Sequence, residues 1–383
     1  MKHIFDQEVS LGIIKGGQLG RMLLPPCMKL GVIPHIMDND PNAPARAYCN
    51  NFTVGEATDF NDVYDFGQNL DAVTIEIENV NKDALKQLRE DGVTVYPGPE
   101  LIEMVQDKGL QKEFYEKHGL PTADFVLIEN RQQLQNRTDL LPFVQKSRRA
   151  GYDGKGVAVI NSAAELDNGF DLPSVLERKV DIKAEISVLV ARNRSGEVKT
   201  YLTVEMVVNR ERNLLDHLCS PARIAVDAED RATDIAISLA EKLGLVGLLA
   251  VEMFVTAKGD VLINEVAPRP HNSGHHTIET NNTSQYEQHL RAIFDLSLGS
   301  TEMIMPSVMV NIIGAKGCSG PVIYEGIKPF LEIPGIHLHL YGKKIVQPFR
   351  KMGHITIVRP RITESLEIAK KIKQEVKAVS CQK

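Results

Sequence analysis

The stretch GLLAVEMFVTAKGDVLINEVAPRPHNSGHHT, residues 247–277, decides how this chain of 383 residues is to be understood. Two apolar runs flank a polar segment with a glycine, a pattern that predicts a β-hairpin. With Lys258 and Gly259 as a two-residue loop, Glu252 lies opposite Glu265. Their side chains then share one face of the hairpin, with Cβ atoms about 4.5–5.5 Å apart.

This predicted pair of carboxylates favours a metal site. Like charges at such a distance repel each other unless a cation lies between them. Hard divalent cations such as Mg²⁺, and also Mn²⁺, bind carboxylate oxygens together with substrate phosphates. Glu252 also lies within an apolar run, where an unpaired charge is costly. Two solvated acids on an edge hairpin are the alternative, and we favour the metal pair Glu252 and Glu265.

A glycine-rich loop, RRAGYDGKG at 148–156, predicts a phosphate contact between two expected strands. Its glycines allow backbone amides to turn towards an anion. Lys155 within the loop and Lys146 in the preceding strand add the positive charge that phosphate sites use.

A second glycine turn, KGGQLG at 15–20, nearly matches the dinucleotide pattern GxGxxG, but Lys15 stands where the first glycine would be. Asp38 ends the next expected strand, so a dinucleotide site is one alternative. The phosphate of a small ribonucleotide at the start of the helix is a second. A purely structural turn is a third, and the sequence leaves all three open.

The order of expected elements predicts three segments. Strands at 10–14, 32–38, 71–80 and 93–99 alternate with helices and indicate a parallel α/β layer up to residue 106. In the strand at 71–80, Val73, Ile75 and Ile77 alternate with Thr74, Glu76 and Glu78. A helix from Asp107 then opens a strand-rich α+β unit, which extends to about 300 and contains a helix at 229–244. A small β-rich segment follows and ends in a charged helix at about 365–377.

Composition narrows the function. The net charge is −6 and no block of basic residues is present, so we expect neither a nucleic acid nor a membrane surface as partner. No run approaches the roughly 20 apolar residues of a membrane span. The polar amino terminus is unlike a signal peptide. Five scattered cysteines without CxxC spacing indicate reduced thiols in a cytoplasmic protein.

Taken together, these motifs resemble the ATP-grasp superfamily, and within it the 5-(carboxyamino)imidazole ribonucleotide synthetases of purine biosynthesis. The motifs that carry the resemblance are GGQLGRM (16–22), EIENV (76–80), DKGLQK (107–112), GLPTA (119–123), AGYDGKG (150–156), AVEMF (250–254), NEVAPRPHNSGHHT (264–277) and RKMGH (350–354). The resemblance implies an ATP-grasp fold of α/β and α+β class. It implies a Rossmann-like pre-ATP-grasp domain over 1–106, an ATP-grasp domain over 107–300 with a lid at about 120–185, and a small β-rich domain over 301–383.

The resemblance also implies a reaction. ATP would phosphorylate bicarbonate to carboxyphosphate, and the exocyclic amine of 5-aminoimidazole ribonucleotide would capture its carbon dioxide equivalent. ADP and phosphate would leave. A cytoplasmic homodimer with these three small-molecule substrates is the implied form of the enzyme.

The site residues follow from the same resemblance. Metal ligands would be Glu252 and Glu265. ATP would contact Lys108, Lys146, Gly151, Tyr152, Asp153, Gly154, Lys155, Gly156, Glu177, Arg178, Lys179, Val180, Glu185, Asn264 and Glu265. The ribonucleotide would contact Gln18, Leu19, Glu78, Arg269, Arg350 and Lys351. The implied catalytic residues are Asp153, Arg269, His271 and Lys351: Arg269 and His271 would steady bicarbonate or carboxyphosphate, and His271 or Asp153 would take the amine proton. His275 and His276 are expected to be structural.

Three positions depart from the family pattern. Lys15 replaces a residue that is usually glycine, and Lys155 stands where some relatives carry arginine, which keeps the charge without its bidentate geometry. Arg210 within VVNRERNLL (207–215) replaces a histidine, so a nucleotide contact from that stretch is in doubt.

Three rival functions are weaker. Another ATP-grasp ligase, for example one that uses formate, does not account for the RPHNSGH and RKMGH motifs. A nicotinamide dehydrogenase leaves Glu252, Glu265 and the loop at 148–156 unexplained. A non-catalytic nucleotide sensor has no need of intact acids and lysines.

Overall fold

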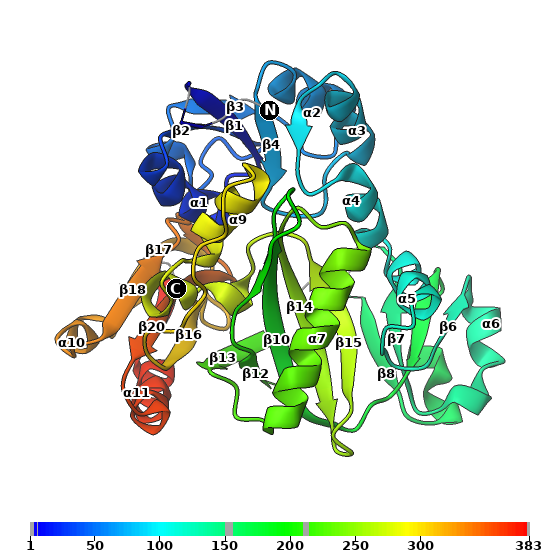
Figure 1. Ribbon diagram of the computed structural model, residues 1–383. Coiled ribbons are helices and arrows are strands. Elements are labelled where there is room, and N and C mark those ends of the chain that lie inside the picture. Colours follow the sequence, from blue (N-terminus) through cyan, green and yellow to red (C-terminus); the bar gives the residue numbers. More distant parts are fainter. Residues whose placement is uncertain (1–3, 6, 150–155, 210–213, 381–383) are drawn as a thin grey trace.

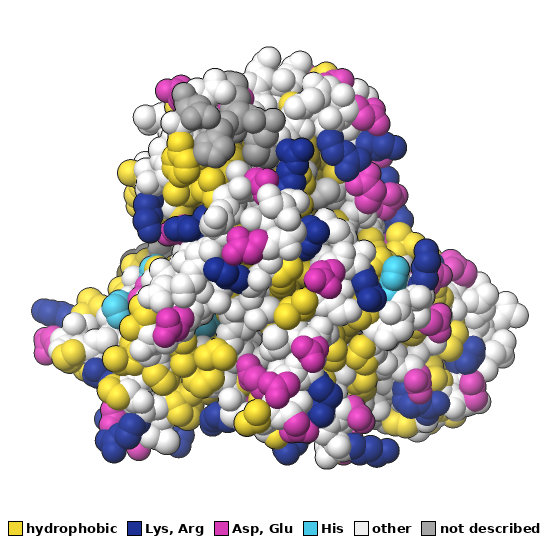
Figure 2. Space-filling view, in the orientation of Figure 1, with side chains coloured by type: hydrophobic (Ala, Val, Ile, Leu, Met, Phe, Trp, Pro, Cys, Tyr) yellow, Lys and Arg dark blue, Asp and Glu magenta, His cyan; other side chains and the backbone are white. Residues whose placement is uncertain are grey.

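The computed structural model describes residues 4–5, 7–149, 156–209 and 214–380 (Figure 1). An N-terminal α/β unit lies at the top of the view, the strands of a large sheet run through the centre, and a smaller sheet lies beside it on the right. In the described part of the chain, no helix is both long and apolar enough to cross a membrane. Figure 2 shows acidic and basic side chains interspersed over this face of the molecule.

The N-terminal unit is a parallel sheet with the strand order β3-β2-β1-β4-β5. Strands β1 and β4 bury nearly all their side chains, as strands do when helices cover both faces of a parallel sheet. The predicted parallel α/β layer is therefore confirmed. Its elements are β1 Val9–Ile14, α1 Gln18–Lys29, β2 Val32–Asp38, the 3-10 turn η1 Arg46–Tyr48, β3 Asn51–Val54, α2 Phe60–Gly67, β4 Ala72–Ile75, α3 Lys82–Glu90, β5 Thr94–Val95 and α4 Pro99–Val105.

The strand predicted at 71–80 is too long, because β4 ends at Ile75. Val73, Thr74 and Ile75 are all buried, so the alternation of apolar and polar residues does not separate a core face from a solvent face. Both faces of β4 are covered. Glu76 and Glu78 follow its carboxyl end, where ligands of open α/β sheets bind.

A second sheet carries the hairpin and continues into the C-terminal segment. Its antiparallel strands follow the order β15-β14-β10-β12-β13-β16-β20-β18, and β11 pairs with β10. The C-terminal segment is rich in strands, as predicted, but β16, β20 and β18 extend the central sheet. These strands are β10 Ile182–Arg192, β11 Val198–Thr200, β12 Val204–Asn209, β13 Leu214–Ser220, β14 Gly247–Thr256, β15 Val261–Ala267, β16 Ser307–Ile313, β18 Ile336–Leu340 and β20 Lys351–Val358.

Helices pack on this sheet from several directions. Helix α7 lies along β10 and β14 (Figure 1), and its buried residues Ala232, Ala236 and Leu239 share a core with Val188 and Val251. Helix α9 contacts β14 and α1, and α11 contacts β16. The remaining elements are α7 Val226–Lys242, η4 Asn272–Gly274, α8 Thr277–Thr280, α9 Gln285–Ile293, β17 Gly320–Glu325, α10 Lys328–Leu331, β19 Ile345–Val346, α11 Ile362–Glu375 and β21 Lys377–Ser380.

The smaller sheet has the antiparallel order β6-β9-β7-β8 and its own core around Phe143 and Leu176. Helix α5 precedes this sheet in the chain and begins after the capping residue Asp107, as predicted. The elements here are α5 Lys108–Lys117, β6 Phe125–Ile128, α6 Arg131–Gln135, η2 Thr138–Leu140, β7 Phe143–Ser147, β8 Val157–Ile160, η3 Ala163–Asn168 and β9 Ser174–Arg178.

His289 of α9 predicts a pH dependence of stability. The ring is fully buried and its Nε2 lies 2.9 Å from Thr74 Oγ1 of β4; burial lowers its pKa from 6.5 to about 4. Between these values the unfolded chain binds a proton that the folded chain does not, so the free energy of unfolding falls as pH falls from 6.5 towards 4. In His289→Gln the amide takes the place of Nε2 and this titration is removed.

Between pH 7.5 and pH 5, we expect the free energy of unfolding of His289→Gln to fall by about 2 kcal/mol less than that of the natural chain. Denaturant unfolding at both pH values measures this, and His337→Gln, at an exposed position of β18, is the control. Equal losses in His289→Gln and the natural chain would contradict the prediction.

Candidate active site

The β14–β15 hairpin places Glu252 opposite Glu265, as predicted, but by a different route. Met253 pairs with Ile263 and the Thr256 amide donates to the Asp260 carbonyl at 2.8 Å, so the loop has three residues, 257–259, and the predicted two-residue loop is wrong. A β-bulge between Met253 and Glu252 then shifts the register by one residue.

Asn264 is the extra residue of this bulge. In a regular strand, neighbouring side chains point to opposite faces, but a bulge re-aims one of them. Asn264 Oδ1 accepts a hydrogen bond from Lys146 Nζ at 2.8 Å, while Glu265 Oε2 accepts one from Lys108 Nζ at 2.5 Å. Two successive residues of β15 therefore reach the lysines predicted to bind ATP.

A buried ion-pair network joins Lys146 and Lys112 to Glu177 of β9. Lys146 Nζ donates to Glu177 Oε2 at 3.0 Å, and Lys112 Nζ lies 3.3 Å from Glu177 Oε1. Burial alone would raise the pKa of Glu177, but Lys146 and Lys112 outweigh it and hold that pKa below its ordinary value. Glu177 is therefore ionised, and its carboxylate is engaged by the two lysines.

Sequence reasoning missed Lys112. Its side chain is only 2 % exposed and also donates to Thr122 Oγ1 at 2.5 Å. Burial lowers its pKa to about 8. The signal was present in DKGLQK, because Lys112 lies one helical turn after Lys108 and hence on the same face of α5.

The two opposed acids differ in charge. Lys108 is the main cause of the low pKa of Glu265, whereas burial, followed by the charges of Glu265 and Glu185, raises the pKa of Glu252. A cation between the two carboxylates would allow both to ionise. The available donors are carboxylate oxygens and the amide oxygen of Asn264, the hard ligands that Mg²⁺ prefers. The Glu265 side chain is 45 % exposed, which leaves space for a ligand.

Arg269 and His271 follow the hairpin on the same side as Glu252. Arg269 Nε and Nη2 lie 2.9 and 3.0 Å from the two oxygens of Glu78. His271 Nε2 is 3.6 Å from Glu252 Oε1, and its Nδ1 is 2.9 Å from Ser273 Oγ. Burial, with Arg269 and Lys351, lowers the pKa of His271 to about 3, so the ring is a neutral imidazole and a weak proton acceptor at neutral pH.

Lys351 begins β20, a strand that the loop after the hairpin contacts. The rings of His275, in that loop, and His354, in β20, have centroids 4.8 Å apart, and Asn272 Nδ2 donates to Asn311 Oδ1 of β16 at 3.2 Å. The charge of Lys351 also contributes to the low pKa of His271. The loop at 271–275 therefore brings the site towards β20, although four strands separate β14 from β20 in the sheet.

The N-terminal residues predicted to bind the ribonucleotide meet the C-terminal segment through Lys343. Lys343 Nζ donates to Gln18 Oε1 at 2.9 Å and to the Lys351 carbonyl at 2.7 Å. The Arg350 guanidinium donates to the Ile345 carbonyl at 3.2 Å. Lys343 was also missed from the sequence, because only the fold brings residues 18 and 343 together.

The turn at 15–20 is filled by carboxylates of the chain itself. The amides of Gly17 and Leu19 donate to Glu76, and the Gly16 amide donates to Asp38 at 2.7 Å. The backbone groups that would hold a pyrophosphate are therefore engaged, which argues against the dinucleotide alternative. Lys15 has φ 79° and pairs with Asp38 at 2.9 Å; this left-handed backbone explains the usual glycine there.

The other predicted residues are more scattered. Arg178 and Lys179 contact Asp124 and Asn161 at the surface, and Val180 lies two residues after the end of β9. Gly156 has φ 73° and its carbonyl accepts from the Ser147 amide. His275 and His276 are fully buried, as a structural role requires. Gly151, Tyr152, Asp153, Gly154, Lys155 and Arg210 lie outside the described residues.

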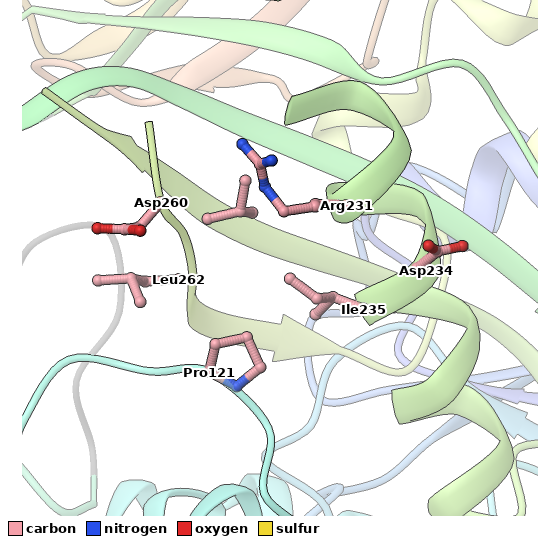
Figure 3. Close-up of a pocket in the computed structure, with 7 residues that line it drawn as sticks. Pro121, Arg231, Asp234, Ile235, Asp260 and Leu262 are labelled. Atoms are coloured by element: carbon pink, nitrogen blue, oxygen red, sulfur yellow. The ribbon is translucent and has the colours of Figure 1, made fainter. Parts of the chain in front are cut away.

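A cavity of about 420 Å³ lies near the turn of the hairpin, away from the opposed acids (Figure 3). Arg231 of α7, in its wall, donates to the Gly259 carbonyl at 2.8 Å and pairs with Asp227, so its charge is already used. None of the predicted site residues that the structure describes lines this cavity. Its lining residues are Pro121, Arg231, Asp234, Ile235, Asp260, Val261 and Leu262.

Family models match the chain in three consecutive parts. They describe a ribonucleotide synthetase preATP-grasp domain at residues 9–106, an ATP-grasp domain at 113–286 and a phosphoribosylaminoimidazole carboxylase C-terminal domain at 307–368. Together they confirm the predicted fold class.

Individual proteins agree. The chain is 35 % identical over 368 residues to N5-carboxyaminoimidazole ribonucleotide synthase of Bacillus subtilis, covering 94 % of this chain and 93 % of that protein. The crystal structure of the synthetase from Thermotoga maritima is 39 % identical, with a TM-score of 0.90 and coverage of 97 % and 99 %. A synthase from Aspergillus clavatus, solved with ADP and 5-aminoimidazole ribonucleotide, is 30 % identical, with a TM-score of 0.86 and coverage of 96 % and 99 %. With this similarity along its length, the chain belongs to the N5-carboxyaminoimidazole ribonucleotide synthase family.

Proposed function

We propose that this enzyme carboxylates 5-aminoimidazole ribonucleotide with bicarbonate at the expense of ATP, through carboxyphosphate. The products are 5-(carboxyamino)imidazole ribonucleotide, ADP and phosphate. The observation that carries the proposal is the convergence of Glu252 and Glu265 with Lys108 and Lys146, beside Arg269 and His271. The Aspergillus clavatus structure, which holds ADP and this ribonucleotide, supports the choice of substrates.

Binding of ATP would depend on the charge and the position of the side chains around its phosphates. Lys108, Lys146 and the loop at 151–156 would hold the phosphates, while Asn264 steadies Lys146. Glu252 and Glu265 would bind Mg²⁺, which neutralises phosphate charge when bound. Because Lys146 and Lys112 engage Glu177, we assign Glu177 to orienting Lys146. The backbone of 178–180 and the Glu185 side chain would then meet the base and the ribose.

The acceptor half lies between the N-terminal sheet and β20. The ribonucleotide would be bound by Gln18, Leu19, Glu78, Arg350 and Lys351. The cations Arg350 and Lys351 would bind its phosphate. Arg269, fixed by Glu78, and neutral His271 would hold the anionic bicarbonate or carboxyphosphate. His271 or Asp153 would take the proton of the attacking amine.

Activity is tested by ADP release with Mg²⁺, ATP and bicarbonate, with and without 5-aminoimidazole ribonucleotide. We expect strong stimulation by the ribonucleotide and an acid-labile carboxylated product. ADP release only with formate in place of bicarbonate would refute bicarbonate as the activated substrate, and ADP release only with another acceptor would refute the assigned acceptor. No ADP under any condition would refute catalysis.

We also propose a homodimer, a cytoplasmic location and domains over 1–106, 107–300 and 301–383. The three matched ranges of the family models support the proposed domain boundaries. Light scattering of the purified chain tests the dimer, cell fractionation tests the location, and limited proteolysis tests the boundaries.

The metal pair predicts the effect of Glu265→Gln. The amide keeps the size of the side chain but removes the charge, so kcat should fall about 100-fold or more at saturating Mg²⁺ and ATP. The control is Asp260→Asn, an exposed acid of the same hairpin, which should keep activity. Full activity of Glu265→Gln, with an unchanged circular dichroism spectrum, would rule the metal pair out.

The proposed role of Lys351 predicts that its substitution affects KM for the two substrates differently. A hydrogen bond to a charged group contributes about 1.5–3 kcal/mol, so Lys351→Ala should raise KM for the ribonucleotide about 10- to 100-fold. KM for ATP should change much less. Lys344→Ala is the control, because Lys344 is a nearby lysine that donates to Asn42. Equal increases for both substrates would refute this assignment.

A further inference from the structure

Asp107 is a buried carboxylate with an unusual set of partners. It caps helix α5, where its Oδ1 accepts from the Gly109 amide at 2.8 Å. The same carboxylate receives Arg148 in a two-pronged contact, Nε to Oδ1 at 2.9 Å and Nη2 to Oδ2 at 3.0 Å. Paired guanidinium–carboxylate contacts fix geometry as well as contributing energy. The Asp107 side chain is only 4 % exposed, so water does not loosen them.

The backbone adds a second connection at the same place. The Lys108 amide donates to the Arg148 carbonyl at 2.9 Å. Lys108 directly follows Asp107 in the chain, and Lys146 at the end of β7 precedes Arg148 by two residues. The contact between Asp107 and Arg148 therefore joins the two segments that carry the phosphate-directed lysines.

Gly109 supplies an independent sign that this contact is close. A Cβ at residue 109 would lie 2.6 Å from Arg148 Nε and 2.9 Å from its Cζ. Any side chain there would push the guanidinium away from Asp107. Helices disfavour glycine, so its presence in the first turn of α5 has a steric reason.

We propose that Asp107 and Arg148 form a clamp that fixes Lys108 and Lys146 relative to each other. Asp107 is thus a positioning residue for ATP binding, one that acts through the two lysines. The inference rests on the proposed role of these lysines in binding ATP phosphates. It adds a function for three residues outside the predicted site, namely Asp107, Gly109 and Arg148.

Asp107→Asn tests the clamp. Asparagine is an equally good helix cap, so α5 keeps its start, but the charged pair with Arg148 is lost. Misplacement of phosphate-binding groups by an ångström costs up to about 100-fold, so KM for ATP should rise about 10- to 100-fold. KM for 5-aminoimidazole ribonucleotide should stay within about twofold. Arg137→Gln, which breaks the exposed pair of Arg137 with Asp139, is the control and should change neither constant.

Gly109→Ala tests the same clamp without touching either charge. The added methyl group displaces Arg148 from the buried Asp107, so the melting temperature should fall and KM for ATP should rise. A structural role alone would lower the stability and leave KM for ATP unchanged. An unchanged KM for ATP in both variants, or equal rises for both substrates, would overturn the proposal.

Binding of Mg²⁺-ADP, measured by calorimetry, separates this proposal from the proposed reaction. If the natural chain binds ADP but the ribonucleotide does not stimulate turnover, the reaction is wrong and the clamp is judged by ADP affinity in Asp107→Asn. Weaker binding in the variant then supports the clamp, and equal binding overturns it. If the natural chain does not bind ADP, both proposals fall.

Discussion

The register of the β14–β15 hairpin is the constraint on which the site depends. One extra residue in β15, Asn264, sets Glu265 opposite Glu252 and lets two neighbouring side chains serve one site. Without the bulge, the pairing seen near the turn would continue and Asn264 would face Glu252. The acids would then lie on different faces, since side chains alternate along a strand. The bulge thus does what a regular hairpin with this three-residue loop cannot.

Charge compensation is the second feature of this site. Lys108 pairs with Glu265, and Lys146 and Lys112 pair with Glu177, so the described lysines and acids neutralise one another. No such ion pair with a lysine is seen at Glu252 among the described residues, and its pKa rises. A bound metal would complete the compensation at Glu252. The paired lysines and acids therefore stabilise one another without a ligand. The site is also suited to a substrate that carries both a cation and phosphates.

Much of this arrangement could be predicted from the sequence, for identifiable reasons. The hairpin and the parallel N-terminal layer follow from local periodicity and turn residues, which act over short distances along the chain. The opposed acids were predicted correctly because the missed bulge offsets the error in loop length. The loop length was wrong because a bulge leaves no clear mark in composition. The strand at 71–80 was too long because both faces of β4 are covered, so polar residues there do not mark solvent. Lys343 and the clamp partner Arg148 depend on contacts between distant segments, which periodicity does not report.

The continuity of the central sheet into the C-terminal segment has a consequence for how this enzyme can diversify. Strand β16 pairs directly with β13, and β20 follows it in the same hydrogen-bonded ladder. Removing the C-terminal segment would therefore leave β13 with an unpaired edge, which invites aggregation. A new acceptor preference cannot be acquired by exchanging this segment as an independent module. It must instead come from side chains and loops around a continuous scaffold, in which β20 carries Lys351 at its first residue.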